Sequence, residues 1–308
     1  MTSPVFIIAE KEFGDAVRSK RLWGMTIVLV ALFALMVFSL SIQATLQSDA
    51  SQQQIVILDP LSKILVSLSS AISFVAPLLG LSLGYDAISG EREKGTMKFL
   101  LVRPVFRDQL INGKALGALI TISFSLGLSG LILTGFSSAF LGATLDPDIV
   151  LRLIVYLLLS ILLSMSYYSI SLIFSAKFEK SSRSLLLSIA VWALFTFVIP
   201  LIAFLFVLSV LGPPPPPQSG EFEEWLMKSS EIQSFIVFAT PNHHFSRVAD
   251  SILLARAAME SRGLGIPEIP ETIAEVITYN WASIIMLILF FAVPYLISYA
   301  IFVSAEKE

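Results

Sequence analysis

The sequence has no cysteine and only two histidines among its 308 residues. Without cysteine, the chain can form neither a disulfide-stapled secreted scaffold nor a thiolate metal site, and it has no cysteine nucleophile. Charged residues make up only 14% of the chain, against roughly 25% in an average soluble domain. The net charge of −3 is too small for a large nucleic-acid footprint, so no nucleic-acid partner is expected.

Hydrophobic residues are abundant instead, at 56% of the chain, more than a soluble globule of this size can cover. A helix needs about 20 predominantly apolar residues to cross about 30 Å of hydrocarbon. Six stretches meet this requirement: Leu22–Leu46, Ile64–Tyr85, Ala115–Gly142, Leu153–Ala176, Leu185–Gly212 and Trp281–Ser304. The first is longer than the roughly 7–15 apolar residues of a signal peptide. We therefore expect an all-α polytopic membrane protein with a single transmembrane domain over residues 1–308.

Lysine and arginine alternate between the connections, which is the pattern that sets the orientation of a membrane protein. The N-terminal segment carries four of them, the connection 86–114 six and the connection 177–184 three. The connections 47–60 and 143–148 carry none. This alternation predicts cytoplasmic N- and C-termini and an external location for residues 213–280.

Residues 1–21 are expected to form an amphipathic interface helix on the cytoplasmic side. Apolar side chains such as Val5 and Phe13 recur at helical spacing, while Glu10 and Arg18 fall on the opposite side. Such a helix buries its apolar face in the membrane interface. It can also pack on the first span, and we expect both.

Residues 213–280 form the long connection between the fifth and sixth spans. Five prolines at 213–217 predict a stiff polyproline II spacer of about 3.1 Å per residue. A helix with an acidic first turn is predicted next, because acidic side chains suit the positive helix N-terminus. Two more helices are expected, after Pro241 and after Pro270. The segment is either a small helical cap or a set of helices lying on the outer leaflet.

The sequence offers little for chemistry inside the membrane. The interiors of the predicted spans hold no ionisable residue, although such residues mark proton and ion pathways. His243 and His244 are adjacent, so they diverge by about 100° on a helix and do not form a metal pair on one face. Residues 90–96 have the glycine spacing of a phosphate loop but lack its lysine. We expect no catalytic residue, no metal site and no cofactor bound by this chain.

The connection 86–114 is the most informative segment. It holds a charged cluster between Gly90 and Gly95, then an apolar turn that Pro104 breaks. A connection that only joins two helices needs a few residues, and this one has about 29. Its mixture of apolar and charged faces suits docking to another protein.

This connection resembles the loop between the second and third spans in permeases of type-2 ATP-binding-cassette exporters, most closely the branch described as multi-copper-enzyme-maturation permeases. That loop reads roughly D-x-I-x-x-E-x-E-x-G-T-L-x-x-L-L-x-x-P-V-x-R, then G-K-x-x-G. The matching residues here are Asp86, Ile88, Glu91, Glu93, Gly95, Thr96, Leu100, Leu101, Pro104, Val105, Arg107, Gly113, Lys114 and Gly117. Met97 stands where leucine is usual. Residues 10–21 also resemble the interface helix of the family.

The resemblance implies a permease without an ATPase site of its own. It would pair with a separate ATP-binding subunit that carries ATP and magnesium, two permeases to two ATPases, the second permease being an identical copy or a paralogue. In the family, the loop and the interface helix sit on the ATPase subunits. The resemblance therefore assigns coupling to Glu91, Arg92, Glu93, Thr96, Pro104 and Arg107, through ion pairing, helix capping and a bend. It assigns Glu10, Phe13 and Arg18 to the interface helix as its functional residues.

Three hypotheses follow. The first is an exporter permease in the cell membrane that forms the translocation path. The second is a non-transporting regulator or sensor of the same fold, which would act through residues 213–280 and lack a continuous polar cavity between protomers. The third is a membrane enzyme, which would need polar catalytic side chains inside the spans. The composition of the spans suits a lipid-like or amphipathic cargo, but it identifies no substrate.

Overall fold

The computed structural model describes residues 3–47, 60–95, 106–141, 147–216, 219–260 and 272–304. Nearly all of these residues are helical and none of them lies in a strand, which confirms the all-α prediction. In chain order the helices are α1 (Pro4–Arg18), α2 (Lys20–Gln47), α3 (Pro60–Gly84), α4 (Ser89–Glu93), α6 (Arg107–Leu141), α7 (Pro147–Lys177), α8 (Ser181–Ala193), the π-helical turn η1 (Leu194–Val198), α9 (Ile199–Leu211), α10 (Glu221–Val237), α11 (Pro241–Glu260), α12 (Ile273–Tyr279) and α13 (Trp281–Ser304).

Six helical stretches are long and apolar enough to cross a membrane, as the sequence predicts. They are Lys20–Ser39, Ala71–Glu93, Arg107–Ala139, Pro147–Lys177, Ser181–Leu211 and Trp281–Ser304. The third begins at Arg107 rather than at the predicted Ala115. The last part of the connection 86–114 therefore already belongs to α6.

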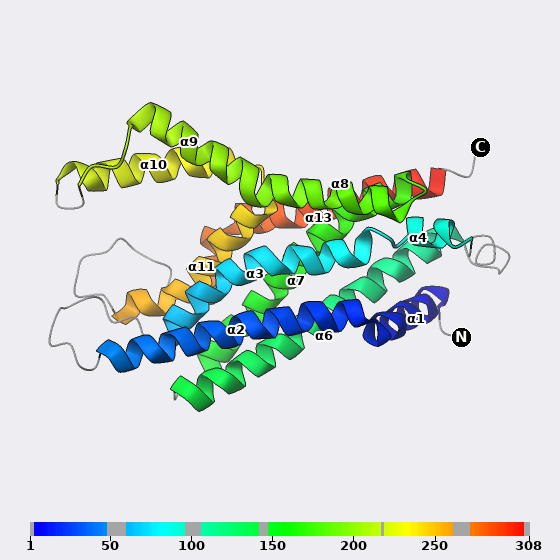
Figure 1. The fold of residues 1–308 in the computed structure, drawn as a ribbon, viewed down its shortest axis with the longest axis horizontal. Helices are drawn as coiled ribbons and strands as arrows, with labels where there is room; N and C mark the ends of the chain where they lie inside the picture. The colour runs from blue at the N-terminus through cyan, green and yellow to red at the C-terminus, as the bar shows by residue number, and fades with distance from the viewer. Residues whose placement is uncertain are drawn as a thin grey trace.

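The helices lie side by side along the longest axis of the molecule (Figure 1). The N-terminal helix α1, the short helix α4 and the C-terminal end of α13 lie at one end, which we call the terminal end. Helix α10 and the outer part of α9 lie at the opposite end, which we call the distal end. The elements that carry the described basic residues of the N-terminal segment and of the connections 86–114 and 177–184 are thus gathered at one end.

Helix α7 lies in the middle of the bundle, packed against α3 and α13. The contact with α3 is very close, because two glycines of α3 face the backbone of α7. A Cβ atom at Gly80 would overlap the carbonyl oxygen of Ser164, and one at Gly84 would overlap the hydroxyl of Ser171. Without a driving force from water, membrane helices associate through such close backbone packing at small residues.

The fifth span joins α8, η1 and α9 into one continuous helix with a local widening. Pro200 is the second residue of α9, so it has no N–H to donate, and its ring crowds the carbonyl of Thr196 four residues earlier. The π-helical turn over 194–198 accommodates the proline without ending the helix.

The described helices of the segment 213–280 pack against the spans. Gly212 adopts a φ of +72°, a left-handed conformation that glycine tolerates, and α9 ends there. Helix α10 then runs back along α9, and the indole Nε1 of Trp225 donates a hydrogen bond to the carbonyl of Gly212 at 3.3 Å. Helix α11 packs among α3, α7 and α13, with Phe245 and Ile252 fully buried.

Two polar clamps hold α11 in place. Near its start, Asn242 accepts a hydrogen bond from the Tyr167 hydroxyl and donates one to the carbonyl of Ser73 at 3.0 Å. Farther along, the guanidinium of Arg152 in α7 donates to the carbonyl of Ile252 at 2.8 Å. Helix α11 is therefore part of the core of the distal end rather than a loosely attached cap.

Candidate docking site at the terminal end

The residues with predicted functional roles lie at the terminal end. The elements that meet there are α1, α4, the start of α6, the last turn of α7, the start of α8 and the end of α13 (Figure 1). These elements are far apart in the sequence, so their polar contacts show which parts of the site are tied together.

Lys114 is the most buried charge of this site, with 4% of its side chain exposed. It lies in the second turn of α6. Its Nζ is 2.8 Å from the Oε1 of Glu12 in α1 and 3.5 Å from the Oε1 of Glu91 in α4. Because a buried ammonium is costly without partners, both carboxylates are held toward it. One lysine therefore joins the interface helix to the connection that follows the second span.

Helix α1 packs on α6, the third span, through two glycines on one face of α6. A Cβ at Gly113 would lie 2.6 Å from the Cβ of Ile8, and one at Gly117 would lie 2.7 Å from the Cβ of Glu12. The prediction placed α1 against the first span, but the glycines of α6 allow the closer approach. This packing gives a physical reason for the two glycines of the G-K-x-x-G pattern.

Aromatic contacts extend the packing of α1 toward the spans. The ring of Phe13 meets the ring of Phe124 of α6 edge-on, with 5.8 Å between centroids. The ring of Trp23 also meets that of Phe124 edge-on, with 6.4 Å between centroids, and its Nε1 donates to the carbonyl of Val17 at 2.7 Å. Phe13, a predicted interface-helix residue, thus packs against the third span.

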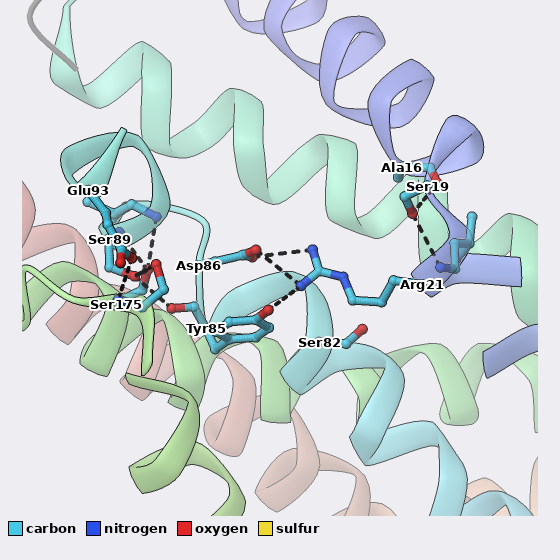
Figure 2. A network of polar contacts seen from close by, with 12 residues as sticks. Ala16, Ser19, Arg21, Ser82, Tyr85, Asp86, Ser89, Glu93 and Ser175 are labelled. Atoms are coloured by element: carbon cyan, nitrogen blue, oxygen red, sulfur yellow. Dashed lines mark hydrogen bonds and ion pairs between the residues drawn. The ribbon is translucent and has the colours of Figure 1, made fainter. Parts of the chain in front are cut away.

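Arg21 ties the start of the first span to the end of the second. Its Nη1 lies 3.1 Å from the Oδ2 of Asp86 and donates to the Tyr85 hydroxyl at 2.7 Å (Figure 2). The guanidinium carbon also lies 5.1 Å from the centroid of the Tyr85 ring. A planar guanidinium suits this combination, since it can bond a carboxylate and face an aromatic ring.

A serine of α7 stabilises the N-terminal end of helix α4. The Oγ of Ser175 accepts hydrogen bonds from the backbone N–H groups of Ile88 and Ser89, at 2.9 and 3.0 Å (Figure 2). The first N–H groups of a helix have no partner within the helix, so an outside acceptor stabilises the helix start. Ser175 thereby fixes α4 to the last turns of α7.

Two predicted residues of α4 make further contacts with neighbouring elements. The Nη1 of Arg92 donates to the carbonyl of Ala176 at 2.7 Å, near the C-terminal end of α7. The exposed carboxylate of Glu93 accepts the backbone N–H of Ser181 at 3.1 Å, so it caps the first turn of α8. Helix α4 is consequently bound to both α7 and α8.

Arg107, at the first turn of α6, reaches the last span. Its Nη1 donates to the carbonyl of Phe302 at 3.2 Å, and its guanidinium carbon lies 5.7 Å from the centroid of the Phe302 ring. A cation near the C-terminal carbonyls of a helix is favourable because those groups carry partial negative charge.

The remaining surface of α1 is open and mixed in character. Glu10 and Arg18 are exposed. Phe6 and Ile7 are 62% and 56% exposed at the start of the same helix. The start of α6 adds Phe106, which is 71% exposed. Exposed aromatic and aliphatic side chains among charges suit a protein partner.

The structure brings four of the six predicted coupling residues, Glu91, Arg92, Glu93 and Arg107, to the terminal end. Thr96 and Pro104 lie outside the described residues. The coupling roles of all six residues stay predictions, as do the interface-helix roles of Glu10, Phe13 and Arg18. Reasoning from sequence assigned no role to Glu12, Arg21, Tyr85 or Ser175. The family pattern contained Asp86 and Lys114 without a function for either, and that pattern was the available signal.

The two histidines lie in the first turn of α11, away from the terminal end. His244 is fully buried, and its Nε2 donates to the carbonyl of Phe238 at 2.8 Å. Burial, His244 and Arg247 lower the pKa of His243 to about 4, so it is neutral near pH 7. Within the described ranges, no three histidine, aspartate or glutamate side chains form a group that would hold a metal ion.

Comparison with known proteins gives a consistent result. The family described as "ABC-2 family transporter protein" matches residues 6–306. A protein of Stutzerimonas stutzeri described as "Probable ABC transporter permease protein NosY" is 32% identical over 212 residues, which is 67% of this chain and 71% of the relative. A protein of the same description from Pseudomonas aeruginosa is 32% identical over 200 residues, 63% of this chain and 67% of the relative.

Proposed function

The chain belongs to the ABC-2 transporter family and is the membrane subunit of an ABC transporter, and from this premise we propose that it is the permease of an ATP-driven exporter. It is a multi-pass protein of the plasma membrane. The permease has no ATPase site of its own in this proposal. Membership of the family implies an ATP-binding partner subunit, which would carry ATP and magnesium.

The partner ATPase docks at the terminal end in this proposal. The basic residues of the N-terminal segment and of the loops 86–114 and 177–184 support a cytoplasmic location for that end. The exposed surface of α1 supplies apolar and charged contacts side by side. The ATPase would rest on α1 and on the connection that begins with α4.

The contacts of α4 would transmit movement of the ATPase subunits to the spans. Ser175 and Arg92 bind α4 to the end of α7, and Glu93 binds it to the start of α8. Lys114 binds it to α6 and to α1. A force on α4 is therefore applied to the third, fourth and fifth spans together. Glu91, Arg92 and Arg107 would hold the docking surface in shape, while exposed Glu10, Arg18 and Glu93 would face the partner.

A second permease, identical or paralogous, would complete the translocation path. The fifth span supports this, because apolar side chains such as Leu201, Phe204 and Leu205 are about half exposed along α9. In a membrane, such a face contacts either lipid or another helix. We propose that the two permeases meet along part of this face and that lipid covers the rest.

The observation that carries the proposal is the set of contacts that joins α1 and α4 at one end of a chain of the ABC-2 family. The test is purification of the tagged full-length chain from its native membranes in mild detergent. A cytosolic ATPase recovered in a one-to-one ratio, and ATP hydrolysis by the complex, is the expected result. A complex without an ATPase that hydrolyses no ATP would overturn the proposal.

A second candidate function is a regulator that couples ATP hydrolysis to an external partner without transport. The exposed apolar residues of α10 favour it, since Met227 and Phe235 are 67% and 84% exposed. Transport assays in sealed vesicles separate the two functions. Deletion of residues 221–237 would abolish the activity of a regulator, whereas an exporter would retain ATPase coupling and transport.

A further inference from the structure

We propose that Lys114 is a positioning residue that holds α1 and α4 together as one docking surface. The inference rests on the proposed function, because the surface is defined by the ATPase that would occupy it. Lys114 itself is 4% exposed, so it contacts no partner directly. It acts through the two carboxylates that it binds.

The two carboxylates come from elements that are otherwise anchored to different helices. Glu12 belongs to α1, which is seated on the glycines of α6. Glu91 belongs to α4, which is fixed to α7 and α8 by Ser175, Arg92 and Glu93. The Nζ of Lys114 lies between them, at 2.8 Å from one carboxylate and 3.5 Å from the other.

The charges around Lys114 make this junction sensitive to its loss. Lys11 contacts Glu12 at 3.5 Å and Asp15 at 3.4 Å within α1, and its charge also acts on Glu91 of α4. The Lys11 side chain is 54% exposed, so water weakens these interactions and they do not replace the buried ammonium of Lys114. Without that ammonium, Glu12 and Glu91 would lose the buried cation that they share and would repel each other across a partly buried gap. Like charges at short distance repel, so α1 and α4 would separate.

Separation of α1 and α4 would matter for docking even if each helix stayed folded. Two contact surfaces in fixed register bind a partner more tightly than two that move independently, because the second contact forms at a high effective concentration. Lys114 would therefore set the affinity for the ATPase without touching it.

The tie between α1 and α4 can be measured directly because the chain has no cysteine. Cysteines introduced by Gly14→Cys in α1 and Lys94→Cys just after α4 accept spin labels. A Cβ at Gly14 meets no atom within 4 Å, and Lys94 is exposed. In the full-length chain, Lys114→Met is expected to broaden the distance distribution between the labels, and Lys114→Arg to keep it narrow.

ATPase affinity, measured with the unlabelled chains, is the second readout. Lys114→Met is expected to lower it by at least about tenfold, since the avidity of a two-part surface is lost. Lys114→Arg should restore most of it. The matched control is Arg152→Met, which removes an equally buried cation from the distal end and should change neither readout.

Two results would overturn the inference: an unchanged distance distribution for Lys114→Met, or a broadened distribution with unchanged ATPase affinity. If that variant does not yield folded protein, Glu91→Gln tests the same tie while keeping the Lys114–Glu12 pair, with the same outcomes. Failure of the wild-type chain to bind any ATPase would instead refute the proposed function. The two failures are therefore distinguishable.

Discussion

The two ends of the bundle differ in how their charges are paired. At the terminal end, ion pairs join elements that are distant in sequence, namely Arg21 with Asp86 and Lys114 with both Glu12 and Glu91. At the distal end, the ion pairs among the described residues stay within one helix, namely Arg152 with Asp148 and Lys228 with Glu224. The ion pairs named for one end fix helices relative to each other, whereas those of the other end lie within single helices.

The difference shows where force can pass between elements. A pair four residues apart on a helix strengthens that helix but does not constrain its neighbours. A pair between two helices resists their separation, provided that it is shielded from water. The terminal end is thus arranged to move several spans together, and the distal end is held mainly by apolar packing and by hydrogen bonds to carbonyls.

The largest effect is expected from a substitution in the middle of the bundle, which would disrupt the terminal end and the distal end together. Gly80→Val places a branched side chain on the carbonyl of Ser164, where α3 meets α7 in the middle of the bundle. Overpacking at a rigid contact costs about 3 kcal/mol or more here, because backbone atoms cannot give way. We expect loss of monodisperse protein in detergent. Size-exclusion chromatography and thermal unfolding measure this loss.

Gly127→Val is the matched control for that experiment. A Cβ at Gly127, in the interior of α6, meets nothing within 4 Å. Equal damage from the two substitutions would show that helix propensity, rather than the α3–α7 contact, sets the cost.

The next largest effect is expected to differ between two neighbouring glutamates of the terminal end, Glu91 and Glu93. Glu91→Lys places a second cation beside buried Lys114, whereas Glu93→Lys reverses the charge of an exposed carboxylate that caps α8 and would face the partner, and it leaves the Lys114 contacts in place. We expect ATPase recovery with the tagged chain to fall at least about tenfold for Glu91→Lys, since the tie to α1 is lost. Glu93→Lys should have a smaller effect. Comparable recovery for both variants would contradict the distinction between the inward and the exposed carboxylate.

A smaller effect is confined to the distal end. Arg152→Met removes the guanidinium donor from the carbonyl of Ile252, and a hydrogen bond from a charged group contributes about 1.5–3 kcal/mol. Hydrogen exchange should accelerate in α11, while α1 and α4 keep their protection and ATPase recovery is unchanged. Lys228→Met, in an exposed pair within α10, serves as the control and should alter neither.

The smallest effect is a pH dependence of α11. The pKa of His243 is lowered to about 4 by burial, His244 and Arg247, from an ordinary value of about 6.5. Folding therefore excludes a proton from His243. This contribution to stability is complete above pH 6.5 and is lost as the pH falls toward 4. Exchange protection of α11 should decline over that window.

His243→Gln tests this assignment, because it removes the titrating group. His244 and Asp250 also titrate on α11, and burial shifts their pKa values in opposite directions, downward for His244 and upward for Asp250. If the exchange protection of α11 still declines over the same pH range in the variant, the pH dependence belongs to His244 or Asp250 instead.

Much of the fold follows from the sequence because hydropathy and helix length decide the spans. All six predicted spans are present, since an apolar run of about 20 residues has few alternatives in a membrane. The prediction began the third span at Ala115 rather than at Arg107, because polar residues at a span end carry no apolar signal. The sequence also did not reveal that α11 enters the bundle, since its apolar face looks the same whether it meets lipid or protein.

The site was predictable in part for a similar reason. Charge and glycine placement in residues 86–95 indicated a docking segment. In the structure, Glu91 of α4 and Glu12 of α1 both contact Lys114. The sequence did not show that Lys114 is buried, because a lysine at the end of a span normally extends to water. Its burial depends on the approach of α1 to α6, which is a tertiary contact between residues about 100 positions apart.

That distance along the chain has a consequence for biosynthesis. Helix α1 leaves the ribosome about 100 residues before its seat on Gly113 and Gly117 is made. At 5–20 residues per second, the delay is roughly 5–20 s. During that time the apolar face of α1 has the membrane surface as its available cover. The amphipathic pattern thus serves the nascent chain first, and the finished permease afterwards packs part of the same face against its third span, while Phe6 stays exposed.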